Sequence, residues 1–356
     1  MLLIYSLFFI ITLCSFLQIF KAIENGVIVR FSLIFIVYFL VIIAGLNTTS
    51  PDYDTYTLMF KSAAELPFSQ YDNIHGEFIF LVISGFLFEA FGSQEAVFTA
   101  FSFFSVTLTV YLITKNSKYV FISVLIYMSH AFLNKEMIQI RAGIASALVL
   151  LAITMQARGK VIKAILAIII GSLFHVSSLI AIVPLILCKL IEPRWHLRLS
   201  FILLLLSYAF YLGGGVDFIV HFLDGIGLLP SRVSNYLEWD EYNFDLGLLN
   251  PNTLKQVFIL LLAMMYFRID KEYTTYFCFF YITVCWLIAF SSVAIIGARV
   301  SSILSVSELI LVPAIIYNTT KNRKILGVVF ILIYATMFIV NFFHKNIISD
   351  IRLEVH

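Results

Sequence analysis

Several ionisable residues of the 356-residue chain stand inside or beside strongly apolar segments, where a charge is costly and commonly marks a site or a pathway. Arg141 lies in QIRAGIASAL, His175 in FHVSSL and Arg299 in GARVSS, while Glu77 opens a further apolar run. The arginines are permanent cations, and the carboxylate and the imidazole can exchange protons. Together these residue types suit a site for an anionic ligand or for proton transfer.

Each feature also has a purely structural explanation. An arginine at a helix end often extends to the membrane interface, and a lone histidine in an apolar segment is more often a packing residue. The segment SPDYDTYTLMF supplies Asp52, Tyr53, Asp54 and Tyr56, and a solvated turn with interfacial tyrosines would give the same pattern. The acidic run EWDEYNFD at 238–245 is typical of a wet surface, although such carboxylates could also bind Mg²⁺ or Ca²⁺.

The residues around Arg141 predict where its side chain points. On one continuous helix, His130, Asn134, Met137 and Arg141 would fall on a single stripe, because residues three and four apart share a helix face. Small residues follow Arg141 and allow neighbouring helices to approach closely. The pattern therefore predicts that Arg141 faces the interior of a helix bundle. The small residues are Ala142, Gly143, Ala145, Ser146 and Ala147.

Composition places these residues in a membrane protein. The chain is 61% hydrophobic and 12% charged, and apolar runs long enough to cross a bilayer recur along its length. We predict an all-α, polytopic membrane helix bundle, one integral membrane domain over 1–356, with roughly 12 crossings and a short outer-leaflet helix. The first run lacks a basic start and a cleavage site, so it is expected to be a membrane helix. The strong segments are 2–20, 31–45, 95–114, 119–133, 142–156, 199–213, 254–268, 274–290, 300–317 and 325–343.

The basic residues predict the orientation, because Lys and Arg concentrate in cytoplasmic loops. Placing all their groups in the cytoplasm requires residues 161–188 to cross and return as a short hairpin, with its turn near 171–175. It also requires residues 78–92 to enter the outer leaflet without crossing. A competing topology places residues 46–76 inside and gives every later segment a normal crossing. The groups are Lys21 and Arg30; Lys115 and Lys118; Arg158, Lys160 and Lys163; Lys189, Arg194 and Arg198; Arg268 and Lys271; Lys321, Arg323 and Lys324.

The preferred topology leaves two acidic loops outside, at about 46–77 and 214–253, and neither is long enough to bury a core of its own. The chain contains no GxxxxGK[ST], HExxH, CxxC or GxSxG motif. Nucleotide hydrolysis, zinc proteolysis and ordinary serine-hydrolase chemistry therefore lack their usual signatures. Neither a cofactor nor a metal ion is expected, so any energy for a reaction must arrive with the substrate.

Five short motifs occur in a fixed order on this background of membrane spans: PDYDTY, Glu77, QIRAGIASAL, FHVSSL and GARVSS. From about residue 30 to about residue 320 the chain resembles the EpsG-like branch of the Wzy-type bacterial polysaccharide (O-antigen or capsule) polymerases. The resemblance implies a multi-pass glycosyltransferase of the bacterial inner membrane whose active site faces the periplasm. Such an enzyme moves a growing glycan from undecaprenyl diphosphate onto the non-reducing end of a lipid-linked repeat unit and releases undecaprenyl diphosphate.

The resemblance also implies catalytic roles. Arg141 and Arg299 would hold the departing diphosphate, with His175 as a third donor or as a proton carrier. Asp52 or Glu77 would accept the proton of the attacking sugar hydroxyl. No metal ion is required, because the lipid diphosphate is already an activated leaving group.

Further residues are expected to contact the substrate. Tyr53 and Tyr56 could stack on sugar rings. The expected partners are the undecaprenyl-diphosphate-linked glycan donor and acceptor, the lipid bilayer, a chain-length regulator and a flippase, and no nucleic acid. The other substrate contacts expected are Gln139, His130, Ser178 and Arg232.

Three other functions compete with a polymerase. A flippase or transporter of lipid-linked oligosaccharide would also need charges inside the bundle, but it commonly shows two related halves, and no internal repeat is evident. A membrane acyltransferase is disfavoured because His175 has no acid nearby in sequence. An O-antigen ligase uses similar groups and differs in its acceptor, so the sequence separates it poorly from a polymerase.

Overall fold

The computed structural model describes residues 2–21, 23, 26–216, 218–219, 222 and 245–343. In this part of the chain every regular element is a helix, which confirms the predicted all-α fold class. The elements are α1 (Leu2–Ile19), α2 (Val27–Gly45), α3 (Tyr53–Glu65), η1 (Phe68–Asn73), α4 (Phe78–Phe91), α5 (Gln94–Asn116), α6 (Val120–Ile126), η2 (Tyr127–Glu136), α7 (Ile140–Ala157), α8 (Val161–Ser172), η3 (Val176–Ala181), α9 (Ile182–Leu190), η4 (Pro193–Trp195), α10 (His196–Leu212), α13 (Pro251–Met265), α14 (Lys271–Ala289), α15 (Ala294–Leu304), η5 (Ser305–Ser307), α16 (Glu308–Asn318) and α17 (Arg323–Phe343).

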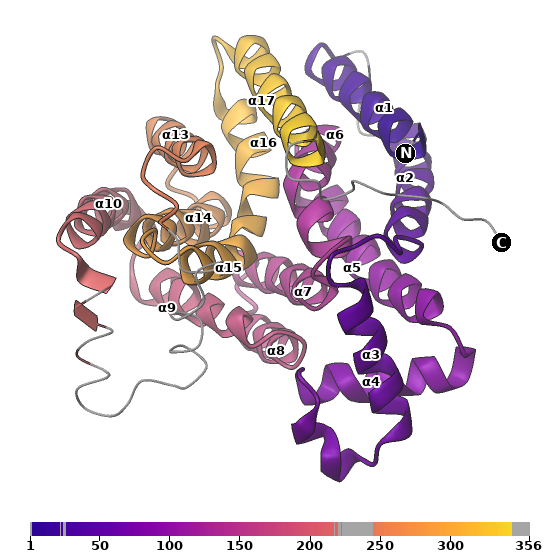
Figure 1. Cartoon of the computed structure of the whole chain (residues 1–356). Coiled ribbons are helices and arrows are strands. Elements are labelled where there is room, and N and C mark those ends of the chain that lie inside the picture. Colours follow the sequence, from indigo (N-terminus) through magenta and orange to yellow (C-terminus); the bar gives the residue numbers. More distant parts are fainter. Residues whose placement is uncertain are drawn as a thin grey trace.

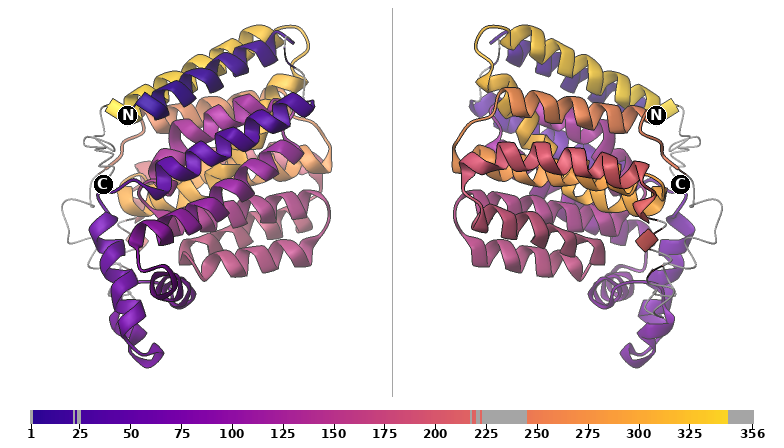
Figure 2. Two further views of the ribbon diagram at one scale, coloured as in Figure 1. Left: turned by 90° about the vertical axis from the view of Figure 1, so that its right-hand side faces the viewer. Right: turned by 90° about the vertical axis from the view of Figure 1, so that its left-hand side faces the viewer.

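The long helices run side by side as one bundle, whereas α3 and α4 lie at one end and cross its axis (Figure 1, Figure 2). Within the described residues, 7 helices are long and apolar enough to cross a membrane, and further apolar helices of 10–17 residues lie between them. This confirms a polytopic helical bundle, while the predicted number of crossings stays a prediction. The short helix α4, predicted to enter the outer leaflet, packs with α3 and α5 at that end.

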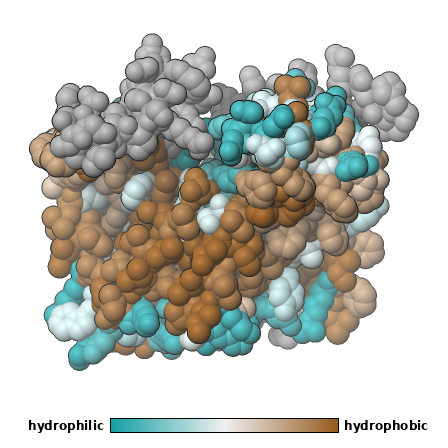
Figure 3. Space-filling view, turned by 90° about the horizontal axis from the view of Figure 1, so that it is seen from below, coloured by the Kyte–Doolittle hydropathy of each residue, from teal (hydrophilic) through white to brown (hydrophobic). Residues whose placement is uncertain are grey.

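On the face seen in Figure 3, hydrophobic side chains form an apolar belt, with hydrophilic side chains along the lower edge and at the upper right. On α8 the exposed side chains of Ile162, Leu166 and Ile169 belong to this kind of surface, and Val183 and Ile186 continue it on α9. A soluble monomer rarely exposes so large an apolar area. The belt therefore fits a surface that lies in lipid.

Basic loops meet at the end of the bundle opposite α3. Lys118 Nζ lies 5.6 Å from the Tyr317 ring centroid, and the Arg323 guanidinium lies 5.1 Å from the same centroid. Arg158 Nη2 donates a hydrogen bond to Asn116 Oδ1 at 3.0 Å. These contacts confirm that the basic groups around 115–118, 158–163 and 321–324 share one end; that this end faces the cytoplasm stays a prediction.

The hairpin predicted for residues 161–188 is present. Helix α8 ends at Ser172, the chain turns through residues 173–175, and η3 followed by α9 returns alongside. The His175 backbone N–H donates to the Gly171 carbonyl at 3.0 Å, which closes the turn. The Val176 backbone N–H, which directly follows the turn, donates to Glu77 Oε1 at the start of α4. The turn therefore lies at the end where α4 begins, as expected if the basic loops on both sides of the hairpin share the other end.

The predicted continuous helix from His130 to Arg141 is wrong. Residues Tyr127–Glu136 form a π-helix, the chain leaves helical geometry at Gln139 (φ −105°, ψ 65°), and α7 begins only at Ile140. Asn47 Nδ2 donates to the Met137 carbonyl at 3.0 Å, which satisfies a backbone acceptor that the break leaves open. The expected stripe is therefore interrupted, and His130 and Arg141 belong to different helices.

Gly143 accommodates a buried carboxylate. A Cβ atom at Gly143 would lie 2.7 Å from Glu136 Oε2. That carboxylate accepts hydrogen bonds from Ser105 Oγ and, at 2.9 Å, from the Tyr127 hydroxyl, so it cannot move without losing them. The small residue predicted to bring helices together thus also makes space for the side chain of Glu136.

Gly143→Ala is expected to lower the free energy of unfolding by ~1–3 kcal/mol, the usual effect of overpacking a core. The expected result is a lower melting temperature of the detergent-purified protein, measured by intrinsic fluorescence. Gly171→Ala is the matched control, since a Cβ there would meet Ser178 Oγ only at 3.3 Å. Equal melting temperatures for the two variants would contradict the role given to Gly143.

Candidate functional site

An ion pair joins the N-terminus of α7 to the start of α4. Arg141 Nη1 lies 2.7 Å from Glu77 Oε2, and the two side chains are 17% and 20% exposed. The second oxygen, Glu77 Oε1, accepts a hydrogen bond from the Val176 backbone N–H at 3.2 Å. One carboxylate therefore ties together α4, α7 and the turn between α8 and η3.

Two aromatic rings pack near the Arg141 guanidinium. The guanidinium lies 5.8 Å from the ring centroids of both Tyr56 and Phe80, a distance at which a cation is attracted to a ring face. The Phe80 ring in turn stacks on Phe101 with centroids 5.1 Å apart, which fixes α4 against α5. Tyr56 is 4% exposed, so in this structure it contacts Arg141 and offers little surface for the sugar stacking that was predicted.

Asp52 lies at the N-cap position of α3 and is half-buried. Burial raises the pKa of its carboxyl, and the positive charges of Arg299 and Arg141 act in the opposite direction. Because these charges come from α15 and α7, Asp52 lies within electrostatic range of both arginines. A carboxylate whose pKa is raised can exchange a proton nearer to neutral pH than an exposed aspartate can.

His175 is the N-cap residue of η3. Burial lowers the pKa of its imidazole to about 4; the Glu77 carboxylate opposes this shift, and the charges of Arg141, Arg299 and Lys135 add to it. His175 is thus neutral at physiological pH. Its Nδ1 accepts a hydrogen bond from the Ser177 backbone N–H at 3.3 Å, so the ring proton sits on Nε2. A neutral imidazole with its proton on Nε2 can donate a hydrogen bond from that nitrogen.

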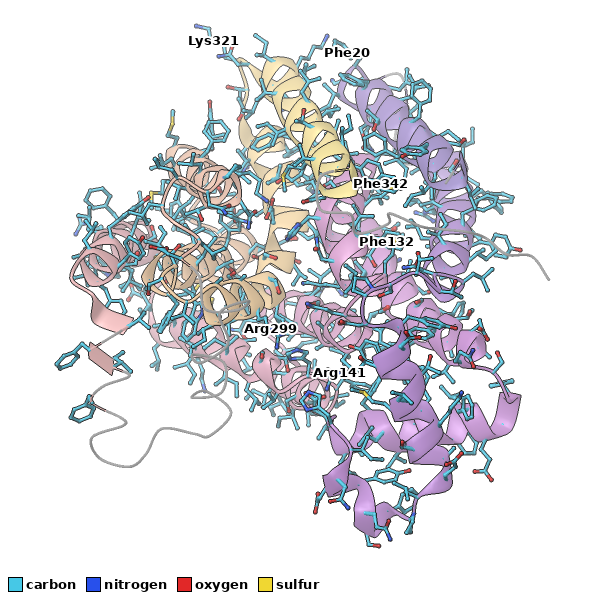
Figure 4. The ribbon with its side chains drawn as sticks, viewed as in Figure 1. Phe20, Phe132, Arg141, Arg299, Lys321 and Phe342 are labelled. Carbon is cyan, nitrogen blue, oxygen red and sulfur yellow. The ribbon has the colours of Figure 1, made fainter. Side chains whose placement is uncertain are left out.

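Arg299 lies on α15, which packs against both α7 and η3. Figure 4 shows Arg141 and Arg299 close together in this view, and the helices that carry them, α7 and α15, are in contact. Arg299 also lines a cavity of ≈ 220 Å³, which we call the polar cavity. The polar cavity is defined by Arg299, Lys135, Gln139, His130, Asn252 and Gln256, together with serine and threonine side chains.

The structure thus brings together all five predicted catalytic residues, Asp52, Glu77, Arg141, His175 and Arg299, which we call the arginine site. Arg141 and Glu77 are paired directly. Asp52 and His175 each lie within electrostatic range of both arginines. The roles given to these residues stay predictions. Their grouping agrees with the preferred topology, in which the segments that carry these five residues all end on the outer side of the membrane.

The residues predicted to contact substrate are dispersed. Gln139 and His130 line the polar cavity. The Tyr53 hydroxyl donates to Glu95 Oε1 at 2.9 Å and its ring stacks on Phe98, so it joins α3 to α5. Ser178 is fully buried beside Gly171 and lies behind the turn. Arg232 falls outside the described residues.

Sequence reasoning missed Lys135 and Glu136, which are both 3% exposed. Lys135 Nζ donates to Ser146 Oγ at 2.7 Å and to the Ser302 carbonyl at 2.6 Å, which links η2 to α7 and α15. Lys135 also lines the polar cavity. The cost of a charge in an apolar segment, which singled out Arg141, applies equally to this Lys-Glu pair.

A buried ion pair between α13 and α16 was also missed. Lys255 Nζ on α13 lies 2.9 Å from Glu308 Oε1 on α16, and the two side chains are 7% and 6% exposed. Gln256 Nε2 donates to Glu308 Oε2 at 2.8 Å, and the Tyr334 hydroxyl of α17 donates to Glu308 Oε1. The network joins three helices beside the polar cavity.

Comparison with known proteins places this arrangement in a family. Residues 29–351 match the EpsG family. The chain is 28% identical over 242 residues to the amylovoran biosynthesis protein AmsC of Erwinia amylovora, an alignment that covers 65% of this chain and 62% of that relative. The chain thus spans less than two thirds of the length of AmsC, and no solved structure matches it. Since the family match runs through α2 to α17 and includes every residue of the arginine site, the chain belongs to the EpsG family.

Proposed function

We propose that this chain is a membrane glycosyltransferase that polymerises glycan repeat units carried on undecaprenyl diphosphate. The observation that carries the proposal is the convergence of Arg141, Arg299, His175, Asp52 and Glu77 at one end of an apolar helix bundle. Membership of the EpsG family and a relative named for amylovoran biosynthesis support a role in polysaccharide biosynthesis.

The arrangement of charges suits transfer from a lipid diphosphate. The hydroxyl oxygen of the acceptor sugar attacks the anomeric carbon of the donor glycan, and the bond from that carbon to the diphosphate breaks. The bonding electrons leave with undecaprenyl diphosphate, whose growing negative charge Arg141 and Arg299 stabilise. Neutral His175 donates a further hydrogen bond through Nε2.

Asp52 accepts the hydroxyl proton in this scheme. Both oxygens of Glu77 already accept hydrogen bonds, from Arg141 and from the Val176 backbone, which makes Glu77 a positioning residue. Asp52 is half-buried and lies near both arginines, and burial raises its pKa. It therefore fits the base better than Glu77.

We further propose that the site faces the periplasm across the bacterial inner membrane. The basic loops gather at the other end of the bundle, and such loops concentrate on the cytoplasmic side. The site would then bind lipid-linked repeat units after a flippase has moved them to the periplasmic side. A chain-length regulator is proposed as a further partner.

Polymerisation by the purified protein tests the function. Wild-type protein in lipid nanodiscs, given lipid-linked repeat units and no nucleotide sugar, is expected to produce a ladder of lengthening glycans with release of undecaprenyl diphosphate. A flippase would produce no ladder, and a ligase would elongate only when its own acceptor is added. Either result would contradict the proposal.

Asp52→Asn is expected to lower the rate of polymerisation by ~10²–10⁴-fold, the usual contribution of a general base. In the wild type the rate should fall as the pH falls, because protonation removes the base. The fall should begin above the ordinary aspartate pKa of 3.8, since burial raises the pKa of Asp52. Asp54→Asn is the control, because Asp54 is exposed on the same turn of α3. If the polymerisation rate of the Asp52→Asn variant still falls with decreasing pH as in the wild type, another group accepts the hydroxyl proton.

A further inference from the structure

The polar cavity contains acceptor oxygens that no described residue satisfies. We infer that it is a sugar subsite, in which hydroxyl groups of the lipid-linked glycan donate hydrogen bonds to Gln256 Oε1 and Asn252 Oδ1. The inference rests on the proposed function and adds the ligand chemistry of a second part of the site. Both residues line the polar cavity, and both oxygens are buried without a partner in the described chain.

The orientation of the Gln256 amide is fixed by its surroundings. Gln256 is 3% exposed, and its Nε2 donates to Glu308 Oε2 at 2.8 Å. A carboxylate accepts hydrogen bonds and cannot donate one when ionised, so the amide nitrogen must face Glu308. The oxygen Oε1 is then the atom left without a partner.

Glu308 is itself held firmly. Lys255 Nζ lies 2.9 Å from its Oε1, and the Tyr334 hydroxyl donates to the same oxygen. The Lys255 ammonium also lies 5.6 Å from the Tyr334 ring centroid. A carboxylate held by side chains from α13 and α17 fixes the Gln256 amide in one orientation before any ligand arrives.

Asn252 adds a second acceptor on the same face of α13. It lies four residues before Gln256, a spacing that brings two side chains together on a helix. Its backbone N–H donates to Asn250 Oδ1 at 2.9 Å, so the start of α13 is capped by another residue and the Asn252 side chain is not needed for that purpose. Buried acceptors without donors are costly, and a ligand that brings donors removes the cost.

Apart from Arg299, Lys135 and His130, the lining of the polar cavity consists of amide, hydroxyl and apolar side chains, which suit sugar hydroxyls. The hydroxyl hydrogens of Ser301, Ser302 and Ser305 are used by carbonyls of their own segment, which leaves acceptor lone pairs on these oxygens. An ionised diphosphate offers only acceptors, whereas sugar hydroxyls donate as well as accept. At ≈ 220 Å³ the polar cavity is smaller than the ~300–1,000 Å³ of sites for drug-sized ligands, which suits a single ring.

Position links this subsite to the reaction. Arg299 lines the polar cavity and its charge acts on both Asp52 and His175. A sugar ring held by Gln256 and Asn252 would therefore lie beside the groups proposed to carry out the transfer.

Binding to the full-length protein in nanodiscs tests the inference. The probes are the glycan released by mild acid from the lipid-linked repeat units of a producing strain, and inorganic diphosphate. Asn252→Ala and Gln256→Met are expected to raise the Kd for the glycan at least ~10-fold and to leave the Kd for diphosphate unchanged, as the loss of hydrogen bonds to hydroxyls predicts. Asn116→Ala, at the opposite end of the bundle, is the control and should bind both probes like the wild type.

The outcomes separate this inference from the proposed function. Wild-type glycan affinity in a folded Asn252→Ala variant, or a weakened affinity for diphosphate alone, would overturn the sugar subsite even if the wild type makes a ladder. Glycan binding that depends on Asn252 without any ladder would keep the subsite and refute the polymerase. Removing the terminal non-reducing sugar from the glycan identifies which substrate occupies the polar cavity. If Asn252-dependent binding is then lost, the polar cavity binds the acceptor's non-reducing end; if binding is retained, it binds the donor glycan.

Discussion

Arg141→Ala is expected to abolish chain extension while the protein still folds and inserts. The guanidinium is held between Glu77 and the rings of Tyr56 and Phe80, so it is already in place before an anionic donor binds. Removing one pre-positioned donor that stabilises developing charge commonly costs ~10²–10³ in kcat. The loss is measured as the disappearance of the polymer ladder in the nanodisc assay, at equal protein concentration.

Matched variants separate chemistry from structure. Arg158→Ala removes an exposed arginine from the other end of the same helix and is expected to leave the ladder unchanged. Arg141→Lys keeps the charge but loses two-point binding, so partial activity with a reduced kcat is expected. Glu77→Gln keeps much of the geometry and should change KM more than kcat. Wild-type ladders from Arg141→Ala would exclude a role for this residue in the transfer.

The grouping of the arginine site could be predicted from the preferred topology, which places residues 46–77 outside, whereas the competing topology with residues 46–76 inside does not give it. Once the basic loops are assigned to one side, the segments carrying Asp52, Glu77, Arg141, His175 and Arg299 must end on the other side. The hairpin of residues 161–188 follows from the same argument. The sequence can thus predict on which side of the membrane a helix ends, but it cannot predict which side chains are partners within the bundle.

Pairings inside the bundle depend on which helices are neighbours. Gln256 and Glu308 are 52 residues apart, and Tyr334 lies a further 26 residues along the chain. Nothing in their local sequence identifies them as partners. The break at Met137–Gln139 was missed for a different reason, because neither a proline nor a glycine marks it. The carbonyl that the break frees is satisfied by Asn47, which lies just after the C-terminal end of α2 and is distant in sequence.

Glu308→Ala is expected to produce the largest loss of stability among the variants considered. The substitution leaves the Lys255 ammonium buried without its carboxylate and removes the acceptor for Gln256 and for Tyr334. Removing one partner of a buried ion pair typically costs ~3–5 kcal/mol, because the other charge stays buried and uncompensated. A strongly lowered melting temperature or a loss of monodisperse protein on size exclusion is the expected measurement. Glu272→Ala, at an exposed glutamate of α14, should change little.

The double variant Lys255→Met/Glu308→Leu tests whether the charges are retained for stability or for the polar cavity. Replacing both members of a buried pair with apolar residues leaves no uncompensated charge, so this variant should melt well above Glu308→Ala. It should still melt below the wild type, because Gln256 and Tyr334 lose their acceptor. It also removes the carboxylate that fixes the Gln256 amide, so glycan affinity should still fall. A stable double variant with wild-type glycan affinity would show that the network serves only packing. Restored stability with lost affinity would show that the buried charges are kept to orient a ligand-binding amide.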